Sequence, residues 1–369
     1  MGKKNIHFQT FIAELLVGLV AVILFLLVCD RTGAFSLKRD DFAERHRWQE
    51  FYELGQGSRI DALVLGNSHG LSSLNCETLS ENMGLNFFAL GHEGAKISGL
   101  YWTLHHALNY VSPELVCLET KSLGFDEGFY KLRLSIHNRR DLGFRSKDAS
   151  TILGAIDQHG FLSIPFTLFG DVFRYPETIE DDPYATLLRL NDWRKEPEEW
   201  KTRLGIHNIY KQGLHGELLE GFRAGNYGRD FQSTVPNDED LRYLDKLIAL
   251  CRGANIELLF YESPYFVHNQ LNLDARHSHL FKVFHERGVP WVNFSSDTDL
   301  TGNPNFFHNS RYNQHMTVAG AEALTEKLTE ILASKAKVSP VFLPKTAMSE
   351  PTIYGDFAVR KGTPPTALP

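Results

Sequence analysis

Short apolar runs alternate along this chain with longer segments in which apolar residues recur at helical spacing. Five runs have the length and continuity of strands that are buried on both faces of a parallel sheet. They lie at residues 60–65, 85–90, 115–118, 256–260 and 289–294. Helical spacing is found at 44–54, 71–82, 97–108, 241–251, 280–286 and 318–332. Strands that alternate with helices predict an α/β fold with a doubly wound parallel sheet.

The longest apolar segment lies near the N-terminus, from Phe11 to Cys29, and Glu14 is its only charged residue. It is long enough to cross a bilayer as a helix. Lys3 and Lys4 precede it, so we expect a transmembrane helix with a cytoplasmic start and an external body. No Ala-x-Ala site follows, which favours an uncleaved anchor over a cleaved signal peptide.

The remaining pattern divides the chain into segments. After a cytoplasmic start and anchor, residues 31–57 are charged and aromatic and predict a stalk or a first surface helix. Residues 58–125 and 237–337 carry the alternating strands and helices of the α/β domain. Residues 126–236 break that pattern and predict an insertion over the active-site edge. Residues 338–369 hold several prolines and predict a loosely ordered tail.

Composition narrows the classes of function. The chain of 369 residues is 43% hydrophobic, which is enough for one large domain with an insertion. Its net charge of −7, without a basic stripe, argues against a nucleic-acid partner. The four cysteines, at 29, 76, 117 and 251, are scattered without zinc-site spacing, although one disulfide pair stays possible. No HExxH, P-loop or GxGxxG motif is present, so we predict no metal and no cofactor.

Ser68 lies in a turn directly after the first predicted strand, in the sequence LVLGNSHG at 63–70. Gly66 and Gly70 bracket the polar tripeptide, and glycine tolerates the backbone angles of a tight turn. A hydroxyl here would stand at the carboxyl edge of the sheet, where open α/β folds place their sites. Ser68 is therefore a candidate nucleophile. The alternative is a serine that only caps the following helix.

His315 lies just before the last predicted helix, for which Thr317 is the expected N-cap. The loop that carries it can reach over the sheet edge. A serine is a poor nucleophile until a base takes its proton, and His315 is the candidate base for Ser68. The alternative is a helix-entry histidine that bonds a backbone carbonyl.

An early serine after the first strand and a late histidine before the last helix follow the chain order of the SGNH (GDSL-like) hydrolase superfamily, which this sequence resembles. Within it, the chain is most similar to the membrane-anchored, extracytoplasmic branch that includes the teichoic-acid D-alanylation protein DltD and the alginate O-acetylation proteins. The resemblance covers about residues 58–125 and 237–335. It implies a flavodoxin-like three-layer fold and an acyl-serine intermediate.

The resemblance also implies where donors to the oxyanion should lie. In the superfamily these are the backbone N–H of the nucleophile, a glycine after the second strand and an asparagine after the third. The N–H groups of Ser68 and Gly91 match the first two. The third position departs from the family pattern, because the chain reads ETKS at 119–122. Thr120 and Lys121 are the candidates that remain there.

A second departure concerns the acid that normally orients the histidine. In the superfamily it lies three residues before the histidine, and here that position is Tyr312. Glu119, Asp297 and Asp299 are candidates for this role from elsewhere in the chain, and a Ser-His dyad is the alternative. We expect His69 and His92 to line the site.

These features predict a single-pass membrane protein with an extracytoplasmic body. Its expected activity is that of an O-acyltransferase or esterase that acts on a cell-envelope polysaccharide through an acyl-Ser68 intermediate. The resemblance implies a cell-envelope glycan as partner and, for acyl transfer, a multipass membrane acyl donor protein of the MBOAT type. The alternative is a catalytically silent SGNH-like accessory protein that binds a glycan or a membrane partner. The missing acid and asparagine favour that alternative.

Overall fold

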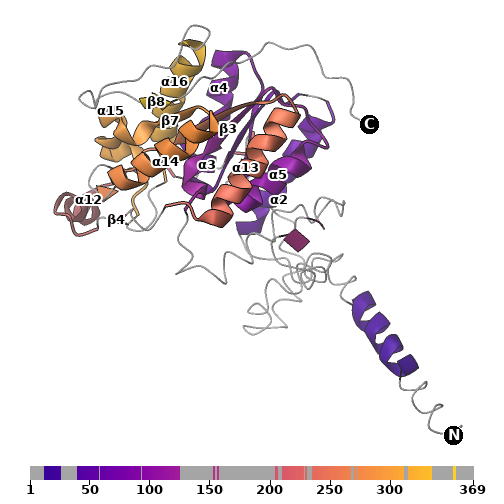
Figure 1. Ribbon diagram of the computed structural model, residues 1–369. Coiled ribbons are helices and arrows are strands. Elements are labelled where there is room, and N and C mark those ends of the chain that lie inside the picture. The colour runs from indigo at the N-terminus through magenta and orange to yellow at the C-terminus, as the bar shows by residue number, and fades with distance from the viewer. Residues whose placement is uncertain are drawn as a thin grey trace, which may run out of the picture. The chain divides into compact units, whose positions relative to one another are not determined.

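The computed structural model (Figure 1) describes part of the chain as two compact units. One unit comprises Met1–Phe42 and Phe144–Glu198, and the other comprises Ala43–Gly143 and Glu199–Pro369. The described residues are 12–25, 40–57, 59–92, 94–124, 153, 156–157, 204–206, 210–227, 229–230, 235–266, 270–271, 273–310, 315–334 and 352–354. The strands and the candidate site all belong to the second unit.

In the first unit, residues 12–25 form a helix whose large apolar side chains are exposed. Leu15, Val17 and Phe25 each leave more than half of their surface uncovered. Within the described ranges, no helix combines the length and the apolarity that a membrane span requires.

The main sheet of the second unit has the strand order β2-β1-β3-β5-β7-β8. Its strands are β1 (Ala62–Gly66), β2 (Phe87–Gly91), β3 (Leu115–Glu119), β5 (Glu257–Glu262), β7 (Trp291–Asn293) and β8 (Thr352–Tyr354). The first five strands in this order pair in parallel, and β8 pairs antiparallel with β7. Taken in chain order, the five parallel strands follow the doubly wound, flavodoxin-like order. The predicted α/β class with a parallel sheet is confirmed.

Helices cover both faces of this sheet. The helices described from residue 40 onward are α2 (Asp40–Gly55), α3 (Ser68–Ser73), α4 (Cys76–Met83), α5 (Ile97–Ala107), α12 (Gly216–Arg223), α13 (Asp238–Gly253), α14 (Leu273–Arg287), α15 (Thr298–Thr301) and α16 (Val318–Ser334). Helices α5 and α13 pack side by side, and α4 packs against α16 (Figure 1). Three short 3-10 helices follow strand or loop ends, namely η1 (Thr120–Ser122), η7 (Phe294–Ser296) and η8 (Pro304–Phe306).

The core follows from the alternation of side chains along each strand. Ala62 and Val64 of β1 belong to one hydrophobic cluster with residues of α4 and α16, such as Leu79 and Leu324. No residue of α5 or α13 belongs to this cluster, so those two helices cover the opposite face of the sheet. The cysteines in the described ranges, Cys76, Cys117 and Cys251, are buried thiols and form no disulfide with one another.

The segment 71–82, which the apolar spacing predicts as one helix, is interrupted. Leu74 is extended, with φ −128° and ψ 146°, so α3 ends before it. Asn75 then caps α4, and its side chain accepts hydrogen bonds from the backbone N–H groups of Glu77 and Thr78. Apolar spacing continues through this break because both short helices bury residues on the same face of the sheet. Spacing alone therefore hides the boundary.

Most of the predicted insertion and most of the predicted tail lie outside the described residues. Within 126–236 the structure describes α12 and β4 (Arg229–Asp230), and β4 pairs in parallel with β6 (Gln270–Leu271). Within 338–369 it describes β8, an edge strand that the sequence pattern does not predict. The domain boundaries stay predictions.

Candidate active site

Ser68 is the first residue of α3 and follows β1 by a single residue, Asn67. Asn67 caps the helix, since its side-chain oxygen accepts a hydrogen bond of 2.9 Å from the His69 N–H. The alternative in which Ser68 serves as the cap is therefore wrong. Strand β1 lies between β2 and β3, at the point where the strand order reverses, and ligand sites of open α/β sheets lie at this point.

The turn at Ser68 is packed too closely for side chains at its flanking glycines. Gly66 pairs with Gly91 across β1 and β2. A Cβ on Gly66 would lie 2.7 Å from the Gly70 Cα and 2.9 Å from the Glu119 Cβ. At Gly91, where φ is +150°, a Cβ would overlap the Gly66 carbonyl oxygen. The predicted oxyanion donor Gly91 thus lies against the turn that carries Ser68.

The fold brings His315 to this turn, although the two segments are far apart in the sequence. The His315 ring lies 4.9 Å from the ring of His69, the residue that follows Ser68. It also stacks on Tyr210, with ring centroids 4.6 Å apart and planes 12° apart. His315 as a whole is only 2% exposed. The helix that follows starts as predicted, because Thr317 Oγ1 accepts a hydrogen bond from the Gly320 N–H.

The His315 ring nitrogen Nε2 is buried and makes no hydrogen bond to any described residue. It therefore bonds neither a backbone carbonyl of the described chain nor the Ser68 hydroxyl. Burial, followed by the positive charge of Lys121, lowers the pKa of His315 to about 3. At neutral pH the imidazole is uncharged, which is the form that can accept a proton.

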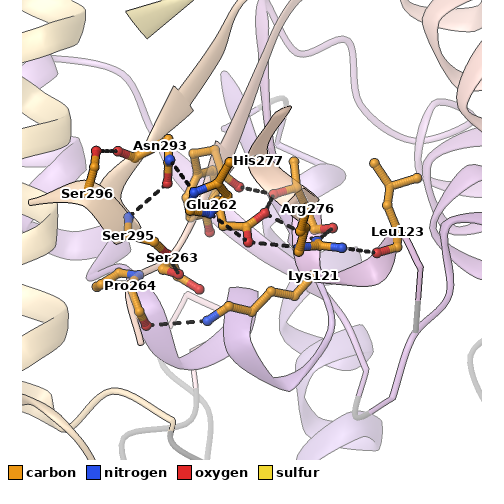
Figure 2. Close-up of polar contacts among 12 residues, drawn as sticks. Lys121, Leu123, Glu262, Ser263, Pro264, Arg276, His277, Asn293, Ser295 and Ser296 are labelled. Atoms are coloured by element: carbon orange, nitrogen blue, oxygen red, sulfur yellow. Dashed lines mark hydrogen bonds and ion pairs between the residues drawn. The ribbon is translucent and has the colours of Figure 1, made fainter. Parts of the chain in front are cut away.

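Lys121 lies beside the same pair of histidines. Lys121 is 5% exposed, and its Nζ lies 3.5 Å from His69 Nδ1. Nζ also donates to the Pro264 carbonyl oxygen at 3.3 Å, as Figure 2 shows, and lies 3.3 Å from the centre of the Tyr265 ring. Of the two donor candidates after β3, Lys121 is the one that the structure places at the histidines.

The hydroxyl of Thr120 bonds Glu262 rather than the histidines of the site. Its Oγ1 donates to Glu262 Oε2 at 2.6 Å, and its backbone carbonyl accepts from Arg276. Thr120 is fully buried in these contacts. Its side chain belongs to the network beneath the turn and not to the histidine cluster.

Two of the candidate acids, Asp297 and Asp299, lie at the start of α15 and interact with groups other than His315. Asp297 caps that helix through hydrogen bonds from the N–H groups of Asp299 and Leu300. Its second oxygen lies 2.6 Å from Lys327 Nζ. The Asp299 side chain is 83% exposed and lies 3.6 Å from the same ammonium. The structure gives neither carboxylate a contact with His315.

Glu119, the third candidate acid, is buried at the end of β3 and bonded to its own neighbours. It accepts from the Lys121 N–H at 2.9 Å and from the Ser263 N–H and hydroxyl at 3.3 and 2.9 Å. Burial raises its pKa to about 7, against the opposing effect of Lys121. Among the described residues, no carboxylate bonds the His315 ring. Tyr312 lies outside the described residues.

A buried ion pair that the sequence analysis did not single out supports the turn after β3. Arg276 of α14 donates to both carboxylate oxygens of Glu262, at 3.0 and 3.2 Å. It also donates to the backbone carbonyls of Thr120 and Leu123, each at 2.9 Å. Burial alone would raise the pKa of Glu262, but Arg276 and His277 hold it well below its usual range. Figure 2 shows Arg276 between Glu262 and Leu123.

Other members of the site carry no sequence motif. Tyr210 and Tyr265 reach the histidines from distant segments, and the His308 ring lies against Tyr210 at a tilt of 43°, with ring centroids 4.6 Å apart. The His69 ring lies against the His315 ring, and His92 is buried directly after β2. Tyr210 belongs to residues 126–236, the segment predicted as an insertion over the active-site edge. The described residues contain no group of three or more histidine, cysteine or carboxylate side chains arranged to hold a metal ion.

Comparisons with known proteins add little to this geometry. No protein-family model matches the chain, and no curated protein matches it by sequence. A solved structure from Bacteroides fragilis NCTC 9343, described as a "putative acylhydrolase", is similar in fold with a TM-score of 0.35 and 11% sequence identity. The match covers 79% of this chain and 97% of that one. At this TM-score the similarity carries no weight in assigning an activity.

Proposed function

We propose that the protein is a serine-dependent enzyme that hydrolyses or transfers acyl esters, with Ser68 as nucleophile and His315 as general base. One observation carries the proposal. A neutral, buried imidazole with an unbonded Nε2 lies against the residue next to Ser68, at the switch point of the sheet. In the neutral tautomer whose proton lies on Nδ1, an unbonded Nε2 can accept the proton of the Ser68 hydroxyl.

The proposed reaction starts with attack of the Ser68 Oγ on the acyl carbonyl carbon, while His315 Nε2 takes the hydroxyl proton. The carbonyl electron pair moves onto oxygen and gives a tetrahedral anion. When that pair returns, the bond to the leaving alcohol breaks, and its oxygen takes the proton from His315. Water or an acceptor hydroxyl then repeats these steps on acyl-Ser68. The products are an acid or a new ester, and free Ser68.

The hydrogen bond from Ser68 to His315 must form when substrate binds, since Nε2 has no partner here. Catalytic hydrogen bonds are often long or absent before substrate is bound. The backbone N–H groups of Ser68 and Gly91 are the proposed donors to the oxyanion. Their place in the closely packed turn supports that role.

The proposed substrate is an acyl ester of a cell-envelope polysaccharide, and the proposed place of the body is outside the cytoplasm. The SGNH-like chain order of Ser68 and His315 supports this class. Exposed apolar side chains on the helix at 12–25 support an anchor in the cell membrane. For acyl transfer, an MBOAT-type membrane protein is the proposed donor.

A catalytically silent accessory protein is the second candidate. The observation that favours it is the absence of any bond from a described carboxylate to the His315 ring. Without such an acid, the imidazolium that forms during attack is less stabilised. Such a protein would bind a glycan or a membrane partner through the same edge of the sheet.

Turnover of an activated ester separates the two candidates. The full-length protein in detergent is mixed with 4-nitrophenyl acetate, and nitrophenol release is followed from the first seconds. The enzyme candidate predicts a burst equal to the amount of protein, which Ser68→Ala abolishes and Ser334→Ala leaves intact. Ser334 lies at the end of α16 and bonds only the Ile331 carbonyl, so it controls for the loss of a hydroxyl. A burst that survives Ser68→Ala, or no burst, favours the silent protein.

A further inference from the structure

The turn after β3 holds a cation in a place where a cation is costly. Lys121 is 5% exposed, and lysine is almost never buried unless its charge is compensated. The groups around its Nζ include the Pro264 carbonyl oxygen, the face of Tyr265 and His69 Nδ1, and its charge also acts on the buried Glu119 carboxyl. An ammonium can only donate, so its contact with His69 is a hydrogen bond when Nδ1 carries no proton.

The backbone on both sides of Lys121 is fixed by a single side chain. Arg276 donates to the carbonyl of Thr120, directly before Lys121, and to the carbonyl of Leu123, two residues after it. The same guanidinium is paired with Glu262, which also accepts from the Thr120 hydroxyl. The buried ion pair therefore ties α14 and the end of β5 to the turn that aims Lys121.

We propose that Lys121 is a further catalytic residue, which stabilises the oxyanion formed when Ser68 attacks an acyl carbonyl, and that Arg276 is the positioning residue that holds it there. This inference rests on the proposed function. Lys121 would donate a hydrogen bond to the carbonyl oxygen as that oxygen gains its electron pair, and no proton would leave Nζ. A preorganised cation in a site with little water is an effective stabiliser of such an anion.

The position of Lys121 supports this role over a purely structural one. A lysine that only fills space would not need its charge next to two histidines, where that charge lowers the pKa of His315. The charge would be productive once an oxyanion forms, because the anion would lie near both Lys121 and the newly protonated imidazole.

The test measures the rate of Ser68 acylation by 4-nitrophenyl acetate in the full-length protein. Lys121→Met keeps the length of the side chain and removes its charge. Loss of one oxyanion donor typically slows the chemical step by about 100-fold or more, and ester binding should change little. Arg276→Lys should slow the same step by about tenfold or more, since small displacements of catalytic groups are costly.

A double-mutant cycle shows whether Arg276 acts through Lys121. Arg276→Lys should slow acylation in the native protein and have no further effect in the Lys121→Met protein. Arg287→Lys is the matched control, because Arg287 also lies on α14, pairs with Asp245 and donates to a backbone carbonyl. If Arg276→Lys prevents folding, Thr120→Val replaces it in the cycle, because it removes the hydroxyl bonds to Glu262 and to the Tyr261 carbonyl oxygen.

The outcomes separate the inference from the proposed function. Lys121→Met that acylates Ser68 at the native rate would overturn the catalytic role of Lys121. Equal slowing by Arg276→Lys in both backgrounds would overturn the positioning role. Slower acylation in Lys121→Met and in Arg276→Lys but not in Arg287→Lys, with no further slowing when the first two are combined, supports both roles. Native protein that never acylates Ser68 overturns the proposed function, and the inference with it.

Discussion

The ring of His315 is held by aromatic contacts and burial. It stacks on Tyr210 and lies against His69, while its Nε2 makes no hydrogen bond within the described chain. The charged group with the largest effect on it is the cation of Lys121, where a Ser-His-Asp triad has an anion. This arrangement keeps the imidazole uncharged at neutral pH but also makes it a weaker base, so the proposed reaction depends on strong stabilisation of the oxyanion.

The first prediction concerns the pH dependence of acylation. Burial and then Lys121 lower the pKa of His315 to about 3, so removing the cation in Lys121→Met should raise that pKa. The acid limb of kcat/KM should therefore move to higher pH in the variant. The other groups around the ring are His69, Tyr210 and His308, and the substitution leaves all three in place. Profiles of both proteins from pH 2.5 to pH 8 with 4-nitrophenyl acetate measure the shift, and coincident limbs would contradict it.

The second prediction concerns the stability of the protein as pH changes. The pKa of Glu119 is raised by burial from its ordinary value of 4.5 to about 7 in the folded protein. The folded state therefore binds more protons than the unfolded state in this window, and stability falls as the pH rises through it. The full loss is about 3 kcal/mol. Glu119→Gln cannot titrate and should lose this dependence.

Urea unfolding of the native protein and of Glu119→Gln at pH 5 and pH 8 measures that effect. The native protein should lose more stability than the variant between the two pH values. Equal losses would show that Glu119 titrates alike in the folded and unfolded chain. The comparison of slopes is independent of any fixed cost of the substitution, such as a weakened bond to Ser263.

Among helices and strands, those that the sequence predicts best are buried on both faces. The five parallel strands lie within a few residues of the predicted runs, because a strand covered by helices on each side must be continuously apolar. The break between α3 and α4 was not predicted, since Asn75 caps α4 inside an uninterrupted apolar rhythm. Strand β8 was not predicted either, because its place depends on pairing with β7, a contact that leaves no local signal.

The candidate site also divides into residues that the sequence predicts and residues that it does not. Ser68, Gly91 and His315 follow strand ends or precede a helix, so sequence order alone brings them to one edge of the sheet. Lys121 was singled out only by its place after the third strand. The packing of Tyr210 and the ion pair of Arg276 with Glu262 depend on long-range contacts between unrelated segments. No spacing in the chain encodes such contacts.

The third prediction concerns the glycine at the end of β2. In Gly91→Ala the new methyl group would overlap the Gly66 carbonyl oxygen, at a φ of +150° that alanine rarely adopts. We expect a loss of about 2 kcal/mol or more in the free energy of unfolding. Gly253→Ala, at the end of α13, meets no atom within 4 Å and should be neutral or stabilising by up to about 1 kcal/mol. Urea unfolding of both variants measures these free energies. Equal changes in Gly91→Ala and Gly253→Ala would contradict the prediction.

At the scale of the whole molecule, the second unit holds the sheet and the candidate site, whereas the apolar helix at 12–25 belongs to the first unit. Activity on a cell-envelope polysaccharide requires the second unit to lie outside the cytoplasm. The fourth prediction is therefore one of topology. Alkaline phosphatase fused after residue 369 should be active, because that enzyme folds only when it is exported and its disulfides form.

A matched fusion to a reporter that works only in the cytoplasm serves as the control. The prediction requires an inactive cytoplasmic reporter together with an active exported one. The reverse pattern would remove cell-envelope glycans as substrates, although it would leave ester chemistry at Ser68 possible. Deletion of residues 1–30 should then release the protein from the membrane fraction.

The most direct test of the central claim is to find the acyl group on Ser68. Full-length protein is incubated briefly with 4-nitrophenyl acetate, quenched in acid, digested and analysed by mass spectrometry. We predict one acetyl group on the peptide that contains Ser68, absent from Ser68→Ala and strongly reduced in His315→Gln. Acetylation spread over lysines with none on Ser68, or equal labelling of the native protein and the His315→Gln variant, would contradict the proposed pair of nucleophile and base.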